Sequence, residues 1–245
     1  YGIGIASTMG IRPTMEDAFT ISSTDTYDLF FIFDGHAGSQ ASRLLADYLD
    51  QTHIDMNNVE SSLVQTLDEL NENIKKHHIN DGSTAAGVLV SYHDRMIYAV
   101  GIGDSRVLSV SNDDFTQLTV DQKPLILSEY KRLKSLGLFI SPEGRIDRKL
   151  AVSRSFGDFW LSSDGLYVKP EVMKMPIKEN DIGIIIACDG LWDVVSNAAA
   201  TEVLRKAENA SDAAVALKNL AIASGSQDNV SVLVVMWNPK SGDEG

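Results

Sequence analysis

The sequence contains a single cysteine, Cys188, among 245 residues. One thiol excludes an intrachain disulfide and a cysteine-based zinc site, and it fits a reducing compartment. Long apolar runs are also lacking, because Gly, Asp or Lys interrupts each candidate within about ten residues, which is too short to cross a bilayer. The chain begins without a charged and apolar leader, so we expect an intracellular protein, in the cytoplasm, the nucleus or both.

Positive charge is scarce. The chain has 21 Lys and Arg against 34 Asp and Glu, which gives a net charge of -13. This charge repels nucleic-acid phosphates and anionic lipids, so we expect neither nucleic acid nor membrane as a partner. Nucleotide-binding glycine loops and the G-x-S-x-G elbow of serine hydrolases are absent as well. Val194 stands where a cysteine-dependent phosphatase would need an arginine after Cys188, so covalent thiol chemistry is disfavoured.

The residues that are present predict one α+β domain over 1–237 and a polar tail over 238–245. Hydrophobic residues make up 44% of the chain, enough for a substantial core. Apolar runs predict strands at 2–7, 18–22, 27–33, 85–91, 96–100, 106–110, 116–118, 182–188 and 230–237. Helical spacing predicts helices at 38–51, 59–79, 127–136, 197–207 and 211–223, the last two capped by Ser196 and Ser211. Strands in runs and helices in pairs are typical of antiparallel sheets covered by helices.

Two apolar runs end in Asp-Gly, one at Asp34 and the other at Asp189. A strand buried on both faces would hold the following carboxylate rigidly, where water solvates it poorly. Two such carboxylates brought together require a shared proton or a bound cation. A type I′ hairpin turn is the alternative meaning of Asp-Gly. The helix-forming sequence at 41–49 argues against a hairpin at Asp34, whereas the alternative stays open at Asp189.

Further carboxylates stand beside glycine or at the ends of predicted strands, at Glu16, Asp17, Asp104, Asp193 and Asp228. None has a nearby Cys or His suited to zinc, and oxygen ligands favour Mg²⁺ or Mn²⁺. Two such ions about 4 Å apart, with a bridging carboxylate and an activated water, form a hydrolytic centre for phosphate esters. We expect Asp34 to be the bridging carboxylate.

Two basic side chains lie close to these carboxylates in the sequence. His36 follows Asp34 by two residues and, if protonated, can donate a proton to a leaving alkoxide. A structural histidine is the alternative, and the neighbouring metal strand favours acid catalysis. Arg12 can clamp phosphate oxygens in a bidentate manner, although the local sequence fits an ordinary surface arginine equally well.

Seven motifs in a fixed order extend from residue 12 to residue 232: Arg12–Asp17, Phe33–Gly38, Gly82–Ala85, Gly103–Arg106, Leu150–Asp158, Ala187–Val194 and Ser226–Val232. Each motif is weak alone. The ordered set resembles the type 2C, metal-dependent protein serine/threonine phosphatases. This resemblance implies a central β-sandwich of two antiparallel sheets flanked by pairs of α-helices, a four-layer αββα arrangement.

The resemblance also implies a ligand set. One Mg²⁺ or Mn²⁺ ion would be held by Asp34, Asp189 and Asp228. The second would be held by Glu16, Asp34 and the backbone carbonyl of Gly35. A third, weaker ion position would match Asp104, Asp189 and Asp193. Arg12 would bind the phosphate, water bridging the first two ions would attack phosphorus directly, and His36 would protonate the departing seryl or threonyl oxygen. Asp17 and Asp158 match supporting positions.

The chain departs from the family pattern in the variable flap, which we define as residues 122–149. Gln122 stands where many relatives carry His. Gly137-Leu138 stands where a Gly-Gly pair is common in the family. These changes affect the expected choice of substrate and leave the metal ligands intact. We therefore expect a monomeric phosphatase acting on phosphoproteins. A pseudophosphatase that serves as a binding module is the alternative, and the net charge of -13 disfavours a metal-dependent nuclease or phosphodiesterase.

Overall fold

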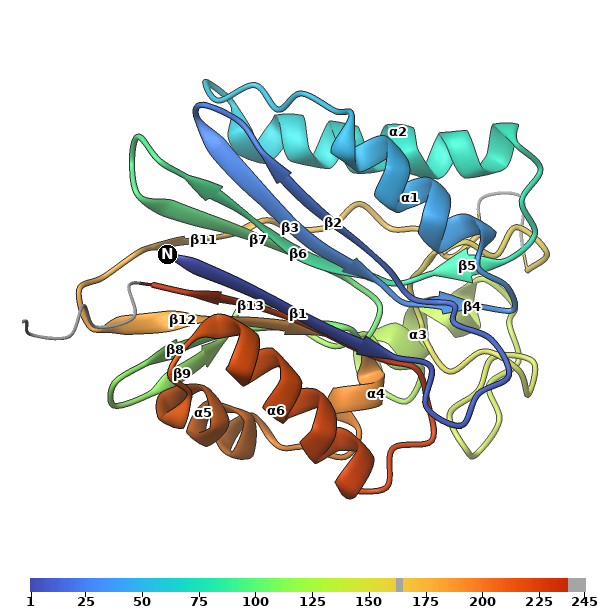
Figure 1. The fold of residues 1–245 in the computed structure, drawn as a ribbon. Coiled ribbons are helices and arrows are strands. Elements are labelled where there is room, and N and C mark those ends of the chain that lie inside the picture. Colours follow the sequence, from blue (N-terminus) through green and yellow to red (C-terminus); the bar gives the residue numbers. More distant parts are fainter. Residues whose placement is uncertain (162–164, 238–245) are drawn as a thin grey trace, which may run out of the picture.

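Two five-stranded antiparallel sheets face each other in the computed structural model, which describes residues 1–161 and 165–237 (Figure 1). The first sheet has the strand order β1 (Gly2–Thr8), β13 (Val230–Met236), β12 (Asp181–Ala187), β8 (Arg106–Ser111) and β9 (Phe115–Gln117). The second has the order β11 (Met173–Pro176), β7 (Met96–Ile102), β6 (Ala85–Ser91), β3 (Tyr27–Phe33) and β2 (Ala18–Ser23). The predicted tail at 238–245 lies outside the described residues.

The two strands that precede the Asp-Gly pairs are buried on both faces. Along β3, Phe30 and Ile32 point between the sheets, whereas Phe31 and Phe33 point toward helices. The same alternation occurs along β12, where Ile184 and Ile186 fill the space between the sheets and Ile185 faces outward to the helical layer. Period-two side-chain geometry inside a four-layer fold thus explains why both runs are continuously apolar.

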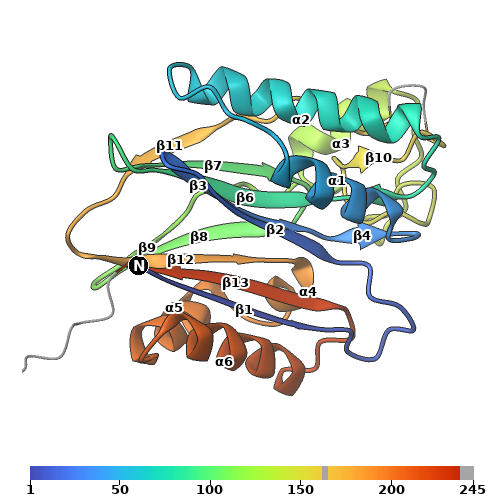
Figure 2. The ribbon, with the colours of Figure 1, turned by 45° about the horizontal axis from the view of Figure 1, so that its top comes forward.

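Pairs of helices cover the outer faces of the sandwich. Helices α1 (Gln40–Asp50) and α2 (Val59–Lys76) pack on the second sheet through a core that includes Leu45 and Leu67. Helices α5 (Asn197–Lys206) and α6 (Ala210–Ala223) cover the first sheet (Figures 1 and 2). This arrangement confirms the predicted αββα sandwich. Within the described ranges, no helix is both long and apolar enough to span a membrane.

One predicted helix cap is confirmed and one is wrong. The Ser196 side chain accepts a hydrogen bond from the Ala199 amide at the start of α5. Helix α6 is capped by Asn209, which accepts from the Asp212 amide at 2.9 Å, and not by Ser211. Both residue types cap helices well, and burial of Ala210 against the first sheet places the start of the helix before Ser211.

Smaller elements at one end of the sandwich position the cleft described below. Strands β4 (Gly35–His36), β5 (Gly82–Ser83) and β10 (Phe156–Gly157) form a three-stranded sheet in the order β10-β5-β4. Helix α3 (Leu127–Ser135) lies in the flap, and its Leu133 joins Ile140 and Ile146 in a separate small core. The short helix α4 (Asp189–Trp192) follows β12 directly. Hence Asp189 opens a helix, which rules out the hairpin alternative.

Candidate metal centre and active site

A cleft of about 350 Å³ opens where β3 and β12 end. It is lined by all of the predicted site residues except Asp193, namely Arg12, Glu16, Asp34, Gly35, His36, Asp104, Asp189 and Asp228. These residues come from segments that are far apart in the sequence. The carboxylates form the part of the lining that we call the floor, defined by Glu16, Asp34, Asp104, Asp189 and Asp228.

The main chain holds Asp34 at the end of β3. Its carbonyl oxygen accepts hydrogen bonds from the Thr84 amide at 2.9 Å and from the Ser83 hydroxyl at 3.2 Å. Across the floor, Asp189 begins α4, and the next residue must be glycine because a Cβ on Gly190 would overlap the carbonyl oxygen of Asn229. Both carboxylates are therefore attached to rigid strand ends, as the sequence predicts.

Burial and mutual repulsion make these carboxylates hard to ionise together. Burial raises the pKa of Asp34 well above its usual range, and the negative charges of Asp189 and Asp17 raise it further. Burial and then the charge of Asp104 raise the pKa of Asp189 to about 8. Burial raises the pKa of Asp17 to about 6. A carboxyl with a pKa of about 8, as at Asp189, holds its proton at neutral pH unless a cation compensates its charge.

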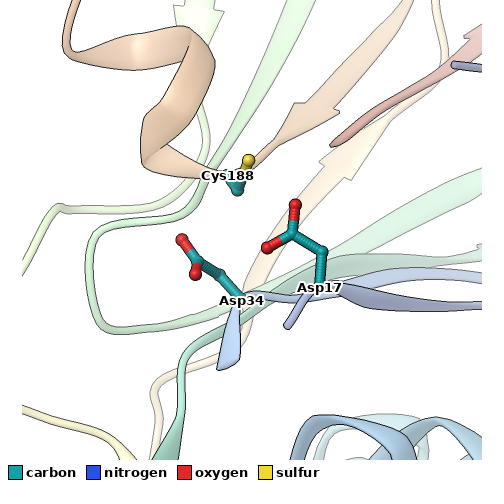
Figure 3. A group of neighbouring side chains, drawn as sticks. All are labelled: Asp17, Asp34 and Cys188. Atoms are coloured by element: carbon teal, nitrogen blue, oxygen red, sulfur yellow. The ribbon is translucent and has the colours of Figure 1, made fainter. Parts of the chain in front are cut away.

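The Asp17 carboxylate is buried beside Asp34 and Cys188. Ala18 pairs with Phe33 between β2 and β3, so Asp17 and Asp34 lie next to each other, with Cys188 facing them (Figure 3). Ligand atoms of these three residues lie within 4.8 Å of one another. Both Asp17 oxygens are buried and find no hydrogen-bond partner among the residues that the structure describes. A hydrated divalent cation would satisfy them, because it binds through oxygen and through its own waters.

The cysteine in this cluster is engaged in two hydrogen bonds with the main chain. Burial raises the pKa of the Cys188 thiol well above its usual value, and the charges of Asp17 and Asp34 add to the effect. The protonated Sγ donates to the Asn229 carbonyl at 3.4 Å and accepts from the Ser231 amide at 3.2 Å. The remaining donor set is therefore all oxygen, which fits Mg²⁺ or Mn²⁺.

Glu16 is held in the floor by residues on both sides of it. Its amide donates to the Asn229 side chain at 2.7 Å, and the Ser42 hydroxyl donates to its carbonyl at 2.5 Å. The Thr14 hydroxyl donates to the Glu16 carboxylate at 2.9 Å. Gly35 packs closely on this segment, because a Cβ at that position would overlap the Glu16 carbonyl oxygen. The main chains of Gly35 and Glu16 are thus in close contact.

Asn229 has a positioning role that our reading of the sequence missed. Its amide nitrogen donates to the carbonyls of Met9 and Thr14, both at 2.9 Å, while its oxygen accepts from Glu16. It therefore fastens the loop that carries Arg12 and Glu16 to the start of β13. In the sequence, only its place directly after Asp228 could have indicated this positioning role.

Arg12 lies at the rim of the floor. Its Nη2 contacts Asp228 Oδ2 at 2.6 Å, and its Nε donates to the Gln227 carbonyl at 3.2 Å. The side chain is 54% exposed, so the guanidinium is both anchored and accessible from the cleft. This position distinguishes Arg12 from an ordinary surface arginine, because it brings a bidentate donor next to a predicted metal ligand.

His36 is oriented by a buried carboxylate. Its Nε2 lies 2.7 Å from Asp158 Oδ2, and Asp158 also accepts from the Ser155 hydroxyl at 2.6 Å and from the Trp160 indole at 3.0 Å. Gly82 makes this contact possible, since a Cβ there would overlap both His36 Nε2 and Asp158 Oδ2. The imidazole therefore stands at a fixed place in the cleft lining.

The carboxylates expected for the third ion share a lysine. Lys123 Nζ lies 2.9 Å from Asp193 Oδ1 and 3.3 Å from Asp104 Oδ2. Asp104 is buried, whereas Asp193 is 57% exposed and lies outside the lining of the cleft. Our reading of the sequence did not single out Lys123, because it lies 70 residues from Asp193. Its ammonium supplies part of the positive charge that this pair needs.

Comparison with known proteins places the chain in a family. A family model described as protein phosphatase 2C matches residues 1–230. Protein phosphatase 2C homolog 1 of Saccharomyces cerevisiae is 32% identical over 265 residues, which cover 96% of this chain and 93% of that protein. The structure of a C. elegans sex determining protein has a TM-score of 0.85 at 27% identity, and the match covers 97% of this chain and 65% of that one.

A third similarity concerns the fold. The crystal structure of serine-threonine phosphatase 2C from Toxoplasma gondii has a TM-score of 0.77 at 22% identity, covering 96% of this chain and 94% of that one. At this identity the similarity shows the fold alone, whereas the family model and the yeast relative define the class of protein as a protein phosphatase. The chain belongs to the protein phosphatase 2C family.

Proposed function

We propose that this chain is an active, metal-dependent protein phosphatase that hydrolyses phosphoserine and phosphothreonine in phosphoproteins. The observation that carries the proposal is the meeting of Glu16, Asp34, Asp189 and Asp228 in one cleft, where burial raises the pKa values of Asp34 and Asp189 well above the usual range. A cluster of this kind is unfavourable by itself and becomes favourable when it binds cations.

The residues fit two Mg²⁺ or Mn²⁺ ions. Asp34, Asp189 and Asp228 would hold one ion, and Glu16, Asp34 and the Gly35 carbonyl would hold the other. Asp104, Asp189 and Asp193 would form a weaker third position, for which Lys123 competes through its contacts with Asp104 and Asp193. Bound ions would supply an activated water and neutralise the phosphate oxygens.

The protein side chains bind the substrate and move the proton. Arg12 at the rim can donate two parallel hydrogen bonds to the phosphate, which fixes the phosphorus over the floor. His36 can protonate the seryl or threonyl oxygen as it leaves, since alkoxides are poor leaving groups without a proton. Asp158 keeps the imidazole in position through the 2.7 Å contact at Nε2.

A binding module without activity is not favoured, because each carboxylate expected for the two main ions is present in the cleft. Phosphate release from a phosphothreonine peptide tests the proposal. We expect release only with added Mn²⁺ or Mg²⁺, its loss in excess chelator, and its return when metal is restored. Release that continues in chelator would contradict the proposal. A monomeric state and a cytoplasmic or nuclear location stay predictions from the sequence.

A further inference from the structure

One part of the cleft wall is basic. Arg145 and Lys149 line it together with Leu150, Ala151 and Val152. The short segment 145–149 contains three cationic residues and only one acidic residue, in a chain whose net charge is -13. A concentration of positive charge beside a phosphatase cleft is therefore a local exception that calls for a physical explanation.

Lys149 is held in place without a carboxylate partner. Its Nζ lies 5.2 Å from the centroid of the Trp160 ring, a cation-π contact. Trp160 in turn donates to Asp158, the residue that holds His36. Across residues 1–161 and 165–237, Lys149 takes part in no ion pair. Its ammonium is exposed at the cleft and free to bind an anion.

The backbone of the turn fixes where Lys149 points. Arg145 Nη1 donates to the Lys149 carbonyl at 2.6 Å, and Ile146 bridges to both Ile140 and Leu150. Arg148 has a left-handed φ of 61°. Its guanidinium lies 5.5 Å from the Phe139 ring and does not line the cleft. Neighbouring cations thus have different surroundings, and only Lys149 combines a cleft position with an aromatic support.

We propose that Lys149, supported by Trp160, binds an anionic side chain of the substrate next to the phosphoresidue, so that the enzyme prefers phosphosites with acidic neighbours. Residues of an extended peptide advance about 3.3–3.6 Å each, so a residue close to the phosphothreonine must pass the flap wall when the phosphate reaches the floor. Aspartate, glutamate and a second phosphoresidue share the required charge. This inference rests on the proposed phosphatase activity.

A set of phosphothreonine peptides tests this subsite. The peptides differ only at the positions that flank the phosphothreonine, which carry Glu, Gln, Lys or phosphoserine in turn. Activity with Mn²⁺ is measured for the wild type, Lys149→Gln, Lys149→Glu and the control Arg148→Gln, with p-nitrophenyl phosphate as a substrate that has no peptide. Arg148→Gln removes the same charge one residue away, outside the cleft.

We expect the wild type to favour the best Glu peptide over its Gln counterpart by about twofold to fivefold in kcat/KM, as for an exposed charge pair. Lys149→Gln should abolish this preference, mostly through KM, and leave hydrolysis of p-nitrophenyl phosphate unchanged. Lys149→Glu should favour the Lys peptide, and Arg148→Gln should behave as the wild type. The phosphoserine peptides then show whether phosphate or carboxylate binds better.

Equal selectivity of the wild type and Lys149→Gln would overturn the subsite while leaving the phosphatase activity intact. A parallel loss of p-nitrophenyl phosphate hydrolysis in Lys149→Gln would also overturn it, because it would assign Lys149 to the reacting phosphate. Wild-type protein that releases no phosphate from any of these substrates with Mn²⁺ would overturn the proposed function itself, and the subsite with it.

Discussion

The floor and the flap of the cleft are stabilised in opposite ways. Two of the floor carboxylates, Asp34 and Asp189, follow the ends of β3 and β12, whose side chains fill the large cores of the sandwich. The negative charges of neighbouring carboxylates act on both, and burial raises the pKa values of Asp34 and Asp189. The flap has its own small core around Leu133 and Ile146, and its central charge, Glu129, is fully paired.

Glu129 shows what a compensated buried carboxylate looks like in this molecule. It is 4% exposed and accepts hydrogen bonds from Arg154 and Arg132. Burial opposes its ionisation, but these hydrogen bonds outweigh burial and lower the pKa to about 2. Among the described residues, no basic side chain forms an ion pair with Asp34 in the floor or with the neighbouring Asp17. The difference supports our proposal that the floor binds cations, whereas two arginines already balance the charge of Glu129.

The largest effect is expected from Asp34→Asn. Metal ions supply several kcal/mol to such reactions, so loss of the bridging ligand should lower kcat/KM about 10³-fold. In chelator the same variant should be more stable than the wild type by about 1 to 2 kcal/mol, because the raised pKa of Asp34 is a cost to folding at neutral pH that a neutral asparagine avoids. Peptide hydrolysis and urea denaturation measure the two quantities.

Asp28→Asn is the matched control for this change. Asp28 is a buried carboxylate on the same strand, far along β3 from the cleft, and it accepts a hydrogen bond from the Tyr92 hydroxyl. This variant should retain activity with Mn²⁺. If Asp34→Asn kept wild-type activity, the floor carboxylates would be no more important for catalysis than a buried acid such as Asp28, and the account would be contradicted.

A smaller loss is expected from Gly82→Ala, which breaks the contact between His36 and Asp158. A displaced general acid should lower kcat for a phosphothreonine peptide by about 10²-fold. Hydrolysis of p-nitrophenyl phosphate should fall less, because nitrophenolate leaves without a proton. Gly2→Ala is the control, since its new Cβ makes only an ordinary 3.7 Å contact. Equal losses on both substrates would argue against acid catalysis by His36.

The smallest effect is expected in the flap, from Glu129→Gln. At neutral pH this change should destabilise the protein by about 2 kcal/mol and leave Mn²⁺ affinity unchanged. The folded pKa of about 2 lies below the ordinary 4.5, so the contribution of Glu129 is full above pH 4.5 and is lost as the pH falls toward 2. Denaturation of both proteins across this range measures the difference.

Exposed Glu143 on the same flap provides the control for Glu129→Gln. Glu143→Gln should leave the midpoint of urea denaturation close to that of the wild type. The stability difference between Glu129→Gln and the wild type should shrink as the pH falls from 4.5 toward 2. If it stayed constant, the two arginines would not be stabilising the charge of Glu129.

Much of the fold could be predicted because its strongest patterns are local. The apolar runs at β3 and β12 and the helical spacing in α2 mark their elements directly. Strands β4, β5 and β10 contain only two residues each, so no periodic pattern can reveal them. The start of α6 was misplaced because Asn209 and Ser211 are both good capping residues, and burial of Ala210 decides between them.

The site residues also divide into those with a local sequence pattern and those without one. Residues of the floor stand beside glycine at strand ends, so Asp34 and Asp189 could be predicted from the sequence. Lys123 and Lys149 could not, because their partners are set by how the flap folds back. Lys123 meets Asp193 across 70 residues, and Lys149 meets Trp160 through a turn with left-handed residues. No local pattern encodes such contacts.

Anomalous diffraction from a crystal soaked in Mn²⁺ tests the metal requirement of the floor most directly. Two peaks about 4 Å apart are predicted, with Asp34 between them and Glu16, Asp189 and Asp228 within bonding distance. A map with no peak among these carboxylates, from protein that still releases phosphate, would contradict the account.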